Sequence, residues 1–219
     1  MTTSQANLVV SFSGGKDSTA MLHKLLEAGE PIHTVLWYVT PWEFMEMHDH
    51  AEEVERRTDI TITRIQPRRE WDTLLVRYGW PHPAGGWCTA EKRQDIGAWI
   101  AANVPNPVEC IGFSDDERPR AEGDTLIRRK RWPLRFPLID RRMGEMDALR
   151  YCYSLGYTWD GLYDWMPSKR VSCWACPKQS DADFAAIARH RPKLWRRMLD
   201  IEHPAVRRLH AMPLFGVPA

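Results

Sequence analysis

The spacing of apolar and polar residues predicts strands and helices that alternate along the chain. Short apolar runs typical of buried strands occur at Leu8–Val10, Ile32–Val39, Thr61–Ile65, Val108–Gly112 and Arg135–Ile139. The last run contains Pro137, which predicts a strand at the edge of a sheet. Apolar residues at helical spacing fill residues 19–28, 43–57, 71–78, 92–104, 145–155, 181–190 and 193–202.

This alternation predicts an α/β fold, with a Rossmann-like, five-stranded, mainly parallel sheet flanked by helices. We expect residues 1–140 to form the α/β domain and residues 141–219 a helical C-terminal annex, packed together as one unit. Ligands of parallel sheets bind beyond the carboxyl ends of the strands. Residues 11–18, 40–41 and 112–114 each follow a predicted strand, so the sequence predicts a site where they meet.

The segment Ser11-Phe12-Ser13-Gly14-Gly15-Lys16-Asp17-Ser18 joins the first predicted strand to the first predicted helix. Paired glycines let the backbone approach a ligand closely, and N–H groups at a helix start favour an anion. A lysine and hydroxyl groups add to this, so we predict a phosphate site. Its expected members are Ser11, Ser13, Gly14, Gly15, Lys16, Asp17, Ser18, Thr40 and Gly112. The alternative is a glycine turn that only starts a helix.

The composition sets limits on partners and compartment. The 219 residues carry a net charge of +1, so a surface for a polyanion would have to be local. No apolar run reaches the roughly 18 residues of a membrane span, and residues 1–6 are polar, without the apolar core of a signal peptide. We therefore expect a cytoplasmic protein with no membrane partner. An odd count of five cysteines favours reduced thiols over a disulfide framework.

Three of the cysteines stand in patterns that suit metal binding. Cys173 and Cys176 form a C-x-x-C pair, a spacing that lets two thiolates reach one metal ion but also occurs in redox pairs. Cys88 precedes a predicted helix, whose start would lower the pKa of its thiol. Cys110 and Cys152 lie among apolar residues and are interpreted as small core side chains.

The residues Ser13 to Ser18 resemble the SGGxDS signature of the PP-loop ATP pyrophosphatases. Further matches place the chain near the branch that contains the phosphoadenylyl-sulfate and adenylyl-sulfate reductases. These matches are Trp87-Cys88-Thr89 with Lys92, Gly112 with Asp116-Glu117 and Arg120, Pro137-Leu138-Ile139, Gly161-Leu162-Tyr163 and Cys173-x-x-Cys176-Pro177. The resemblance implies binding of ATP and Mg²⁺, cleavage between the α and β phosphates, and transfer of AMP to a substrate oxygen.

Two departures from the reductases shape the functional prediction. The reductases carry a catalytic cysteine in a C-terminal tail, and no cysteine follows Cys176 here. The iron–sulfur reductases combine two adjacent cysteines with a later C-x-x-C pair, whereas here Trp87 precedes Cys88, which leaves the three cysteines Cys88, Cys173 and Cys176. By resemblance to tRNA- and DNA-thiolating members of this superfamily, three cysteines would hold a [4Fe–4S] cluster with one open iron. The alternative is a structural Zn²⁺ with His82 or water as the fourth ligand.

We therefore predict an ATP-dependent sulfurtransferase that acts on a nucleic-acid or nucleotide-like substrate. Its predicted catalytic residues are Lys16, Asp17, Cys88 and Cys176. One alternative is a sulfonucleotide reductase that acts on adenylyl sulfate or its 3′-phosphorylated form. Another is a non-catalytic nucleotide-binding subunit stapled by a metal.

Lys92, Arg118, Arg120 and Arg131 are the predicted substrate-binding residues. Arg118 and Arg120 would clamp a phosphate, or else pair with the acids around them. The basic run Arg128–Arg131, beside Trp132, suits the backbone and a stacked base of tRNA or DNA, or else forms a solvated face.

Other expected partners are a sulfur donor and, as one alternative, a second copy of the chain. The basic residues at 189–191 and 196–197 are interpreted as exposed helix faces.

Overall fold

Five parallel strands form the centre of the molecule. The computed structural model describes residues 6–82, 86–123, 131–171 and 173–202. The strands are β1 (Asn7–Phe12), β2 (Ile32–Tyr38), β3 (Ile62–Ile65), β4 (Pro107–Ile111) and β5 (Leu134–Arg135). They lie in the order β3-β2-β1-β4-β5, and every neighbouring pair is parallel. The predicted fold class is confirmed, with a sheet that is wholly parallel.

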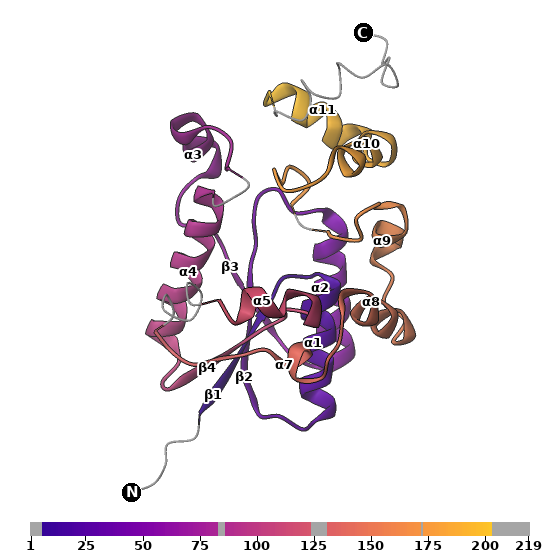
Figure 1. The fold of residues 1–219 in the computed structure, drawn as a ribbon. Coiled ribbons are helices and arrows are strands. Elements are labelled where there is room, and N and C mark those ends of the chain that lie inside the picture. The colour runs from indigo at the N-terminus through magenta and orange to yellow at the C-terminus, as the bar shows by residue number, and fades with distance from the viewer. Residues whose placement is uncertain (1–5, 83–85, 124–130, 172, 203–219) are drawn as a thin grey trace, which may run out of the picture.

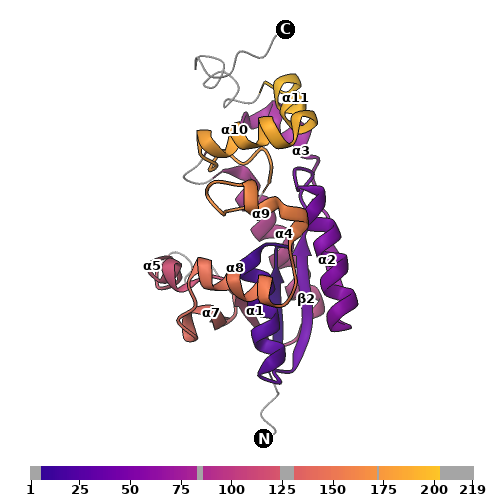
Figure 2. The same cartoon turned by 90° about the vertical axis from the view of Figure 1, so that its right-hand side faces the viewer.

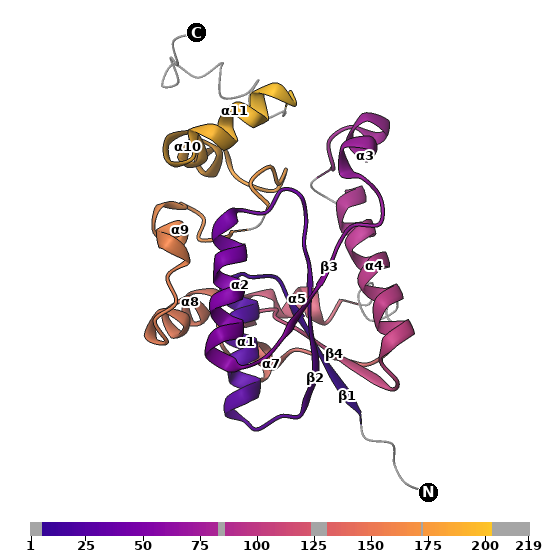
Figure 3. The same ribbon diagram turned by 180° about the vertical axis from the view of Figure 1, so that it is seen from behind.

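Helices cover both faces of this sheet. The longer ones are α1 (Lys16–Glu27), α2 (Met45–Thr58), α3 (Trp71–Tyr78), α4 (Trp87–Asn103), α8 (Glu145–Ser154), α10 (Asp181–His190) and α11 (Pro192–Asp200). The short ones are η1 (Asp115–Glu117), α5 (Arg118–Ala121), α7 (Pro137–Asp140), η2 (Trp159–Gly161) and α9 (Leu162–Trp165). Helices α1 and α2 lie on one side of the sheet and α4 on the other (Figures 1 and 3).

The core forms because β1 is apolar along almost its whole length, as expected for a strand covered on both faces. Val9 and Val10 are fully buried, and α1 presents Leu22 and Leu25 to the same core. Helix α8 packs against α1. Cys110 on β4 and Cys152 on α8 are fully buried, which confirms their prediction as core side chains.

The strand predicted at 135–139 is wrong beyond Arg135. Pro137 instead begins the helical turn α7, because proline lacks an N–H group and its fixed φ suits the first turn of a helix. Two predicted helices also begin earlier than expected. Helix α1 begins at Lys16 and α4 at Trp87, so Lys16 and Cys88 both lie in a first helical turn.

Helices α10 and α11 lie beyond the carboxyl ends of the strands, at the far end of the molecule from the first described strand residues (Figures 1 and 2). Ser180 caps α10, because its hydroxyl accepts a hydrogen bond from the N–H of Asp183 at 3.1 Å. The division of the chain at residue 140 stays a prediction. Among the described residues, no helix has the length and apolarity that a bilayer crossing needs.

Candidate functional site

The loop between β1 and α1 depends on glycine at two positions. Gly14 has a φ of +75°, in the left-handed region that side chains disfavour. Gly112, just after β4, lies against the start of α1. A Cβ atom at Gly112 would lie 3.2 Å from backbone atoms of Asp17 and Ser18. The end of β4 and the first turn of α1 are therefore so close that a side chain at position 112 would require one of them to shift.

Hydroxyl groups fix the shape of this loop from within. The Ser18 hydroxyl accepts a hydrogen bond from the N–H of Ser13 at 3.1 Å and donates to the carbonyl of Gly15 at 3.0 Å. The two serine hydroxyl oxygens are 3.1 Å apart. The hydroxyl of Ser11 is used elsewhere, because it donates to Glu109 on β4 at 2.8 Å. Its predicted contact with a nucleotide stays a prediction.

Side chains from the second half of the chain hold the loop from outside. The thiol of Cys152 donates to the carbonyl of Lys16 at 3.3 Å, and the indole of Trp159 donates to the carbonyl of Gly14 at 2.7 Å. The N–H of Lys16 donates to the hydroxyl of Tyr163 at 2.9 Å. Sequence reasoning missed these three supports, although Gly161-Leu162-Tyr163 belongs to the motif matches and marks the region.

Of the two charged side chains in the loop, Lys16 is buried and Asp17 half-buried, and they are only partly paired. Lys16 is 3% exposed, and its Nζ lies 2.9 Å from Asp17 Oδ2 and 3.7 Å from Glu145 Oε2. The other oxygen of Asp17, Oδ1, is buried without a hydrogen-bond partner in the described part of the chain. Burial raises the pKa of Asp17, and Lys16 opposes that rise. A buried carboxylate oxygen without a donor is a ligand that suits Mg²⁺.

The start of α1 also suits an anion. Within the described ranges, the N–H groups of Gly15, Asp17 and Ser18 have no acceptor from the protein. They stand at the positive end of the helix dipole. The loop can therefore hold a phosphate on its N–H groups and a divalent cation on Asp17, which is the combination that a Mg²⁺–nucleotide needs.

The three cysteines of the predicted metal site lie on two segments. Cys88 lies in the first turn of α4, and the N–H of Cys176 donates to the carbonyl of Cys173 at 3.0 Å in a tight turn. Cys88 interacts electrostatically with Cys176, and so does Cys173. Their chemistry fits a soft metal centre. In the described ranges, however, no three His, Cys, Asp or Glu side chains are grouped so that they could hold a metal ion.

The start of α4 is expected to lower the pKa of the Cys88 thiol, and the structure gives the opposite direction. Burial raises the pKa of the Cys88 thiol, and burial raises the pKa of Cys173 well above its ordinary value. Burial dominates because the thiols lie in tryptophan-rich surroundings, with Trp87 and Trp174 adjacent in sequence. An apolar shell of this kind disfavours a bare thiolate.

Tryptophans form a continuous cluster beside the cysteines. The ring of Trp42 lies 4.9 Å from that of Trp71, 5.3 Å from Trp80, 5.9 Å from Trp87 and 6.5 Å from Trp174, measured between ring centres. The N–H of Trp174 also donates to the carbonyl of Trp42 at 2.8 Å. This cluster fixes the C-x-x-C turn to the segment that follows β2.

The loop of residues 13–18, the predicted phosphate loop, lies next to the C-x-x-C segment. A Cβ atom on Gly15 would lie 3.9 Å from the carbonyl of Val171, two residues before Cys173. Thr40, at the carboxyl end of β2, lies with its hydroxyl 3.1 Å from the sulfur of Cys173. The same hydroxyl lies 3.1 Å from Glu43 Oε1.

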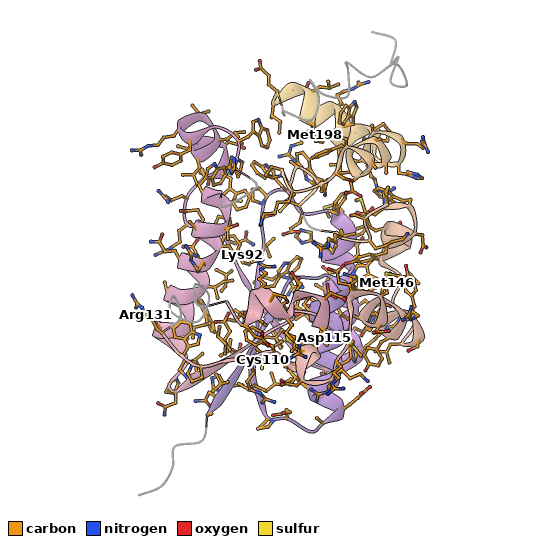
Figure 4. The ribbon with its side chains drawn as sticks, in the orientation of Figure 1. Lys92, Cys110, Asp115, Arg131, Met146 and Met198 are labelled. Atoms are coloured by element: carbon orange, nitrogen blue, oxygen red, sulfur yellow. The ribbon has the colours of Figure 1, made fainter. Side chains whose placement is uncertain are left out.

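Lys92 joins this group from α4, on the side that faces the rest of the molecule (Figure 4). Its charge opposes the rise that burial causes in the pKa of Glu43 and in that of Cys173.

The predicted phosphate clamp on the loop after β4 is occupied by ion pairs. Arg118 Nε donates to Asp115 at 3.0 Å, and Arg120 pairs with Glu117 at 2.7 Å. Pairing with neighbouring acids, the alternative interpretation, is therefore what this structure contains. Arg131 is exposed, and residues 128–130 of the basic run lie outside the described residues.

Residues 7–179 match the phosphoadenosine phosphosulfate reductase domain family. The chain belongs to that family. The matched span includes the phosphate loop, Gly112 and all three cysteines of the predicted metal site. The match therefore covers both the loop of residues 13–18 and the three cysteines.

This family member is similar to proteins of known sequence and of known structure. Two proteins of Methanocaldococcus jannaschii, MJ0066 and MJ0973, are 27% and 23% identical to it over 198 residues, or 87% of this chain. The chain spans 40% and 46% of their lengths, less than half of each. A similar solved structure is the U34-tRNA thiolase NcsA from Methanococcus maripaludis with its [4Fe–4S] cluster. It has a TM-score of 0.55 and 14% identity, and covers 98% of this chain and 76% of its own.

Proposed function

We propose that this protein is an ATP-dependent sulfurtransferase of the PP-loop type that acts on a nucleic-acid or nucleotide-like acceptor. One observation supports the proposal: the start of α1 adjoins the C-x-x-C segment, since Val171 lies beside Gly15 and Thr40 lies beside Cys173. A site that adenylates the acceptor and a site that supplies sulfur, placed side by side, suit a reaction in which one acceptor group is first activated and then thiolated.

In the first step, an oxygen of the acceptor attacks the α-phosphorus of ATP, and pyrophosphate leaves. Lys16 and the N–H groups at the start of α1 would hold the phosphates and the negative charge that develops on them. Asp17 Oδ1 would ligate Mg²⁺. Lys16 would exchange its longer contact, to Glu145, for a phosphate oxygen.

In the second step, a sulfur nucleophile attacks the acceptor atom that bears the adenylated oxygen. The bond between these two atoms breaks, and AMP leaves with the oxygen. Cys88, Cys173 and Cys176 would hold a [4Fe–4S] cluster, which when bound supplies an open iron that can carry sulfide from a donor. The tryptophan cluster would exclude water from this side of the site, so that water does not compete with sulfide. Lys92 would stabilise negative charge on the acceptor side.

The test measures pyrophosphate release and thiolated product with anaerobically prepared protein, sulfide and candidate acceptors. Lys16→Ala should lower both. Cys176→Ala should abolish the thiolated product while ATP still binds. Normal thiolation by Cys176→Ala would overturn the cysteine mechanism, and ATP binding without any pyrophosphate release would favour a non-catalytic subunit.

The family to which the chain belongs favours a second candidate, reduction of a sulfonucleotide. The same loop would then bind adenylyl sulfate or its 3′-phosphorylated form in place of ATP. Release of sulfite from either nucleotide with thioredoxin as reductant would support this candidate and overturn the first. Absence of sulfite together with ATP-dependent thiolation would remove it.

A further inference from the structure

A cavity of about 780 Å³ adjoins the cysteine site. It lies between the carboxyl ends of β2 and β3, the start of α3, and α11. This volume is within the range of roughly 300–1,000 Å³ found for ligand pockets. We name this cavity the α11 cleft.

The inner wall of the α11 cleft is shared with the cysteine site. Thr40 and Glu43 line the cleft, and the hydroxyl of Thr40 is also the group beside Cys173. Trp174, which lines the cleft too, stands between the two cysteines of the C-x-x-C turn. A molecule in this cleft would therefore reach toward the sulfur site from the side away from β4.

Two cations stand at the outer edge of the α11 cleft. Lys193 and Arg197 lie four residues apart on α11, which places them on the same helix face, and both are exposed. Within the described ranges, neither has a carboxylate oxygen within 4 Å. Arg197 lies with its guanidinium 5.0 Å from the ring centre of Trp174. The sequence indicates that Arg197 is a solvated charge on an exposed helix face, whereas in the structure Arg197 also packs on an aromatic ring.

The other charges of the α11 cleft are mostly paired. Arg191 donates to Glu46 at 2.7 Å, and Arg69 donates to Glu91 at 2.7 Å. Glu70, at the start of α3, is exposed on the wall opposite α11. Glu43, which also lines the cleft, accepts a hydrogen bond from Thr40 at 3.1 Å. Among the described residues of the cleft, the cations without a carboxylate partner are Lys193 and Arg197, so a polyanion would run along the α11 side.

Apolar surface completes the α11 cleft. Met45 lines the cleft with 67% of its surface exposed, and Pro41 and Pro67 line the cleft too. A bare phosphate or sulfate would gain nothing from such a wall. A nucleotide has both a flat apolar base and charged phosphates, and it would use the apolar wall and the two cations together.

We propose that the α11 cleft binds a single-stranded segment of nucleic acid, with phosphates on Lys193 and Arg197 and a base against Met45. This deepens the proposed function, on which it rests, because it names the class of acceptor and the side from which it reaches the cysteines. The two cations belong to α11 and are separate from the basic run at 128–131.

The experiment measures binding of fluorescently labelled twelve-residue oligo(U) and oligo(dT) to the full chain by anisotropy, over a series of salt concentrations. Lys193→Ala with Arg197→Ala should weaken binding about tenfold or more and lower the salt slope by about 0.7 for each cation removed, the value for single strands. Met45→Ala should weaken binding of the oligonucleotides and leave binding of inorganic polyphosphate unchanged. Comparison of the two oligonucleotides separates RNA from DNA as the source of the segment.

Arg189→Ala and Arg196→Ala are the matched controls, because both residues are exposed on α10 and α11 and neither lines the cleft. Their affinities should stay within about twofold of the unchanged protein. Equal losses in the control and cleft variants would overturn the proposal, as would oligonucleotide binding unchanged by the double substitution.

ATP-dependent pyrophosphate release is measured in parallel. Pyrophosphate release that persists without oligonucleotide binding at the cleft would overturn only the proposal that the cleft binds nucleic acid. Oligonucleotide binding at the cleft without any pyrophosphate release would overturn only the proposed sulfurtransferase activity.

Discussion

The hydroxyl of Tyr163 accepts a hydrogen bond from the backbone N–H of Lys16 at 2.9 Å, across 147 positions of sequence. Tyr163 is almost fully buried, and its oxygen lies 3.2 Å from the place where a Cβ of Gly15 would stand. The phosphate loop is thus held by a side chain that follows the whole sheet in the sequence. Its geometry depends on the packing of the chain after residue 140 as much as on its own glycines.

Tyr163→Phe should lower the free energy of unfolding by about 1–3 kcal/mol, because it leaves the N–H of Lys16 buried without an acceptor. Urea unfolding measures this. Tyr153→Phe is the matched control, since the exposed Tyr153 hydroxyl donates to Asp164 at 2.7 Å and water can replace it. Equal losses in the two variants would contradict the role given to Tyr163.

Gly112→Ala should weaken ATP binding about tenfold, equivalent to about 1.4 kcal/mol, because the new methyl group would push against the backbone of Asp17 and Ser18. Isothermal titration with ATP and Mg²⁺ measures this. Gly97→Ala on α4 is the control, because a Cβ there meets nothing within 4 Å. It should leave ATP affinity unchanged and stabilise the fold by about 0.5–1 kcal/mol. Unchanged ATP affinity in Gly112→Ala would show that the close approach at the loop is unimportant.

Stability should fall on acidification because of His50. Its Nε2 lies 2.8 Å from the hydroxyl of Thr19, and burial lowers its pKa to about 3, helped by the charges of His23 and Arg57. Below about pH 6.5 the unfolded chain binds a proton that the folded chain does not. The free energy of unfolding therefore decreases as pH falls from 6.5 toward 3, by about 2 kcal/mol between pH 7 and pH 5.

Urea unfolding of the unchanged protein and of His50→Gln at both pH values tests this. Glutamine keeps a polar group near the position of Nε2 but does not titrate, so the loss on acidification should be smaller in the variant by about the same amount. Parallel losses in the two proteins would assign the acid sensitivity to other groups, with His23 the first candidate because burial lowers its pKa also.

Metal content should depend on three of the five cysteines. Anaerobically prepared protein should contain iron and absorb visible light, and Cys88→Ala, Cys173→Ala and Cys176→Ala should each remove most of the iron. Cys110→Ala is the control, since Cys110 is buried in the core. One colourless zinc ion per chain would reject the cluster and keep a structural metal. Iron retained by Cys88→Ala would remove Cys88 from the site.

Much of the site could be predicted because its signals are local. The Ser13–Ser18 segment is typical of a phosphate loop in its glycines, its hydroxyls and its position after an apolar run, and the structure builds it at the start of α1. For Arg118 and Arg120 the sequence permits two alternatives, a phosphate clamp and ion pairs with neighbouring acids. The structure contains the ion pairs, with Asp115 and Glu117. Only the folded geometry of the loop after β4 decides between them.

The sequence by itself determined the alternation of strands and helices, the glycine-rich loop before α1 and the C-x-x-C pair, because each rests on residues close together in the chain. Tertiary structure alone decided which side chains brace the loop, how strongly burial acts on the thiols, and that α11 forms one wall of a cleft beside Thr40. These properties depend on contacts between residues far apart in the chain. Such contacts form when apolar surfaces pack, and they leave no periodic pattern in the sequence.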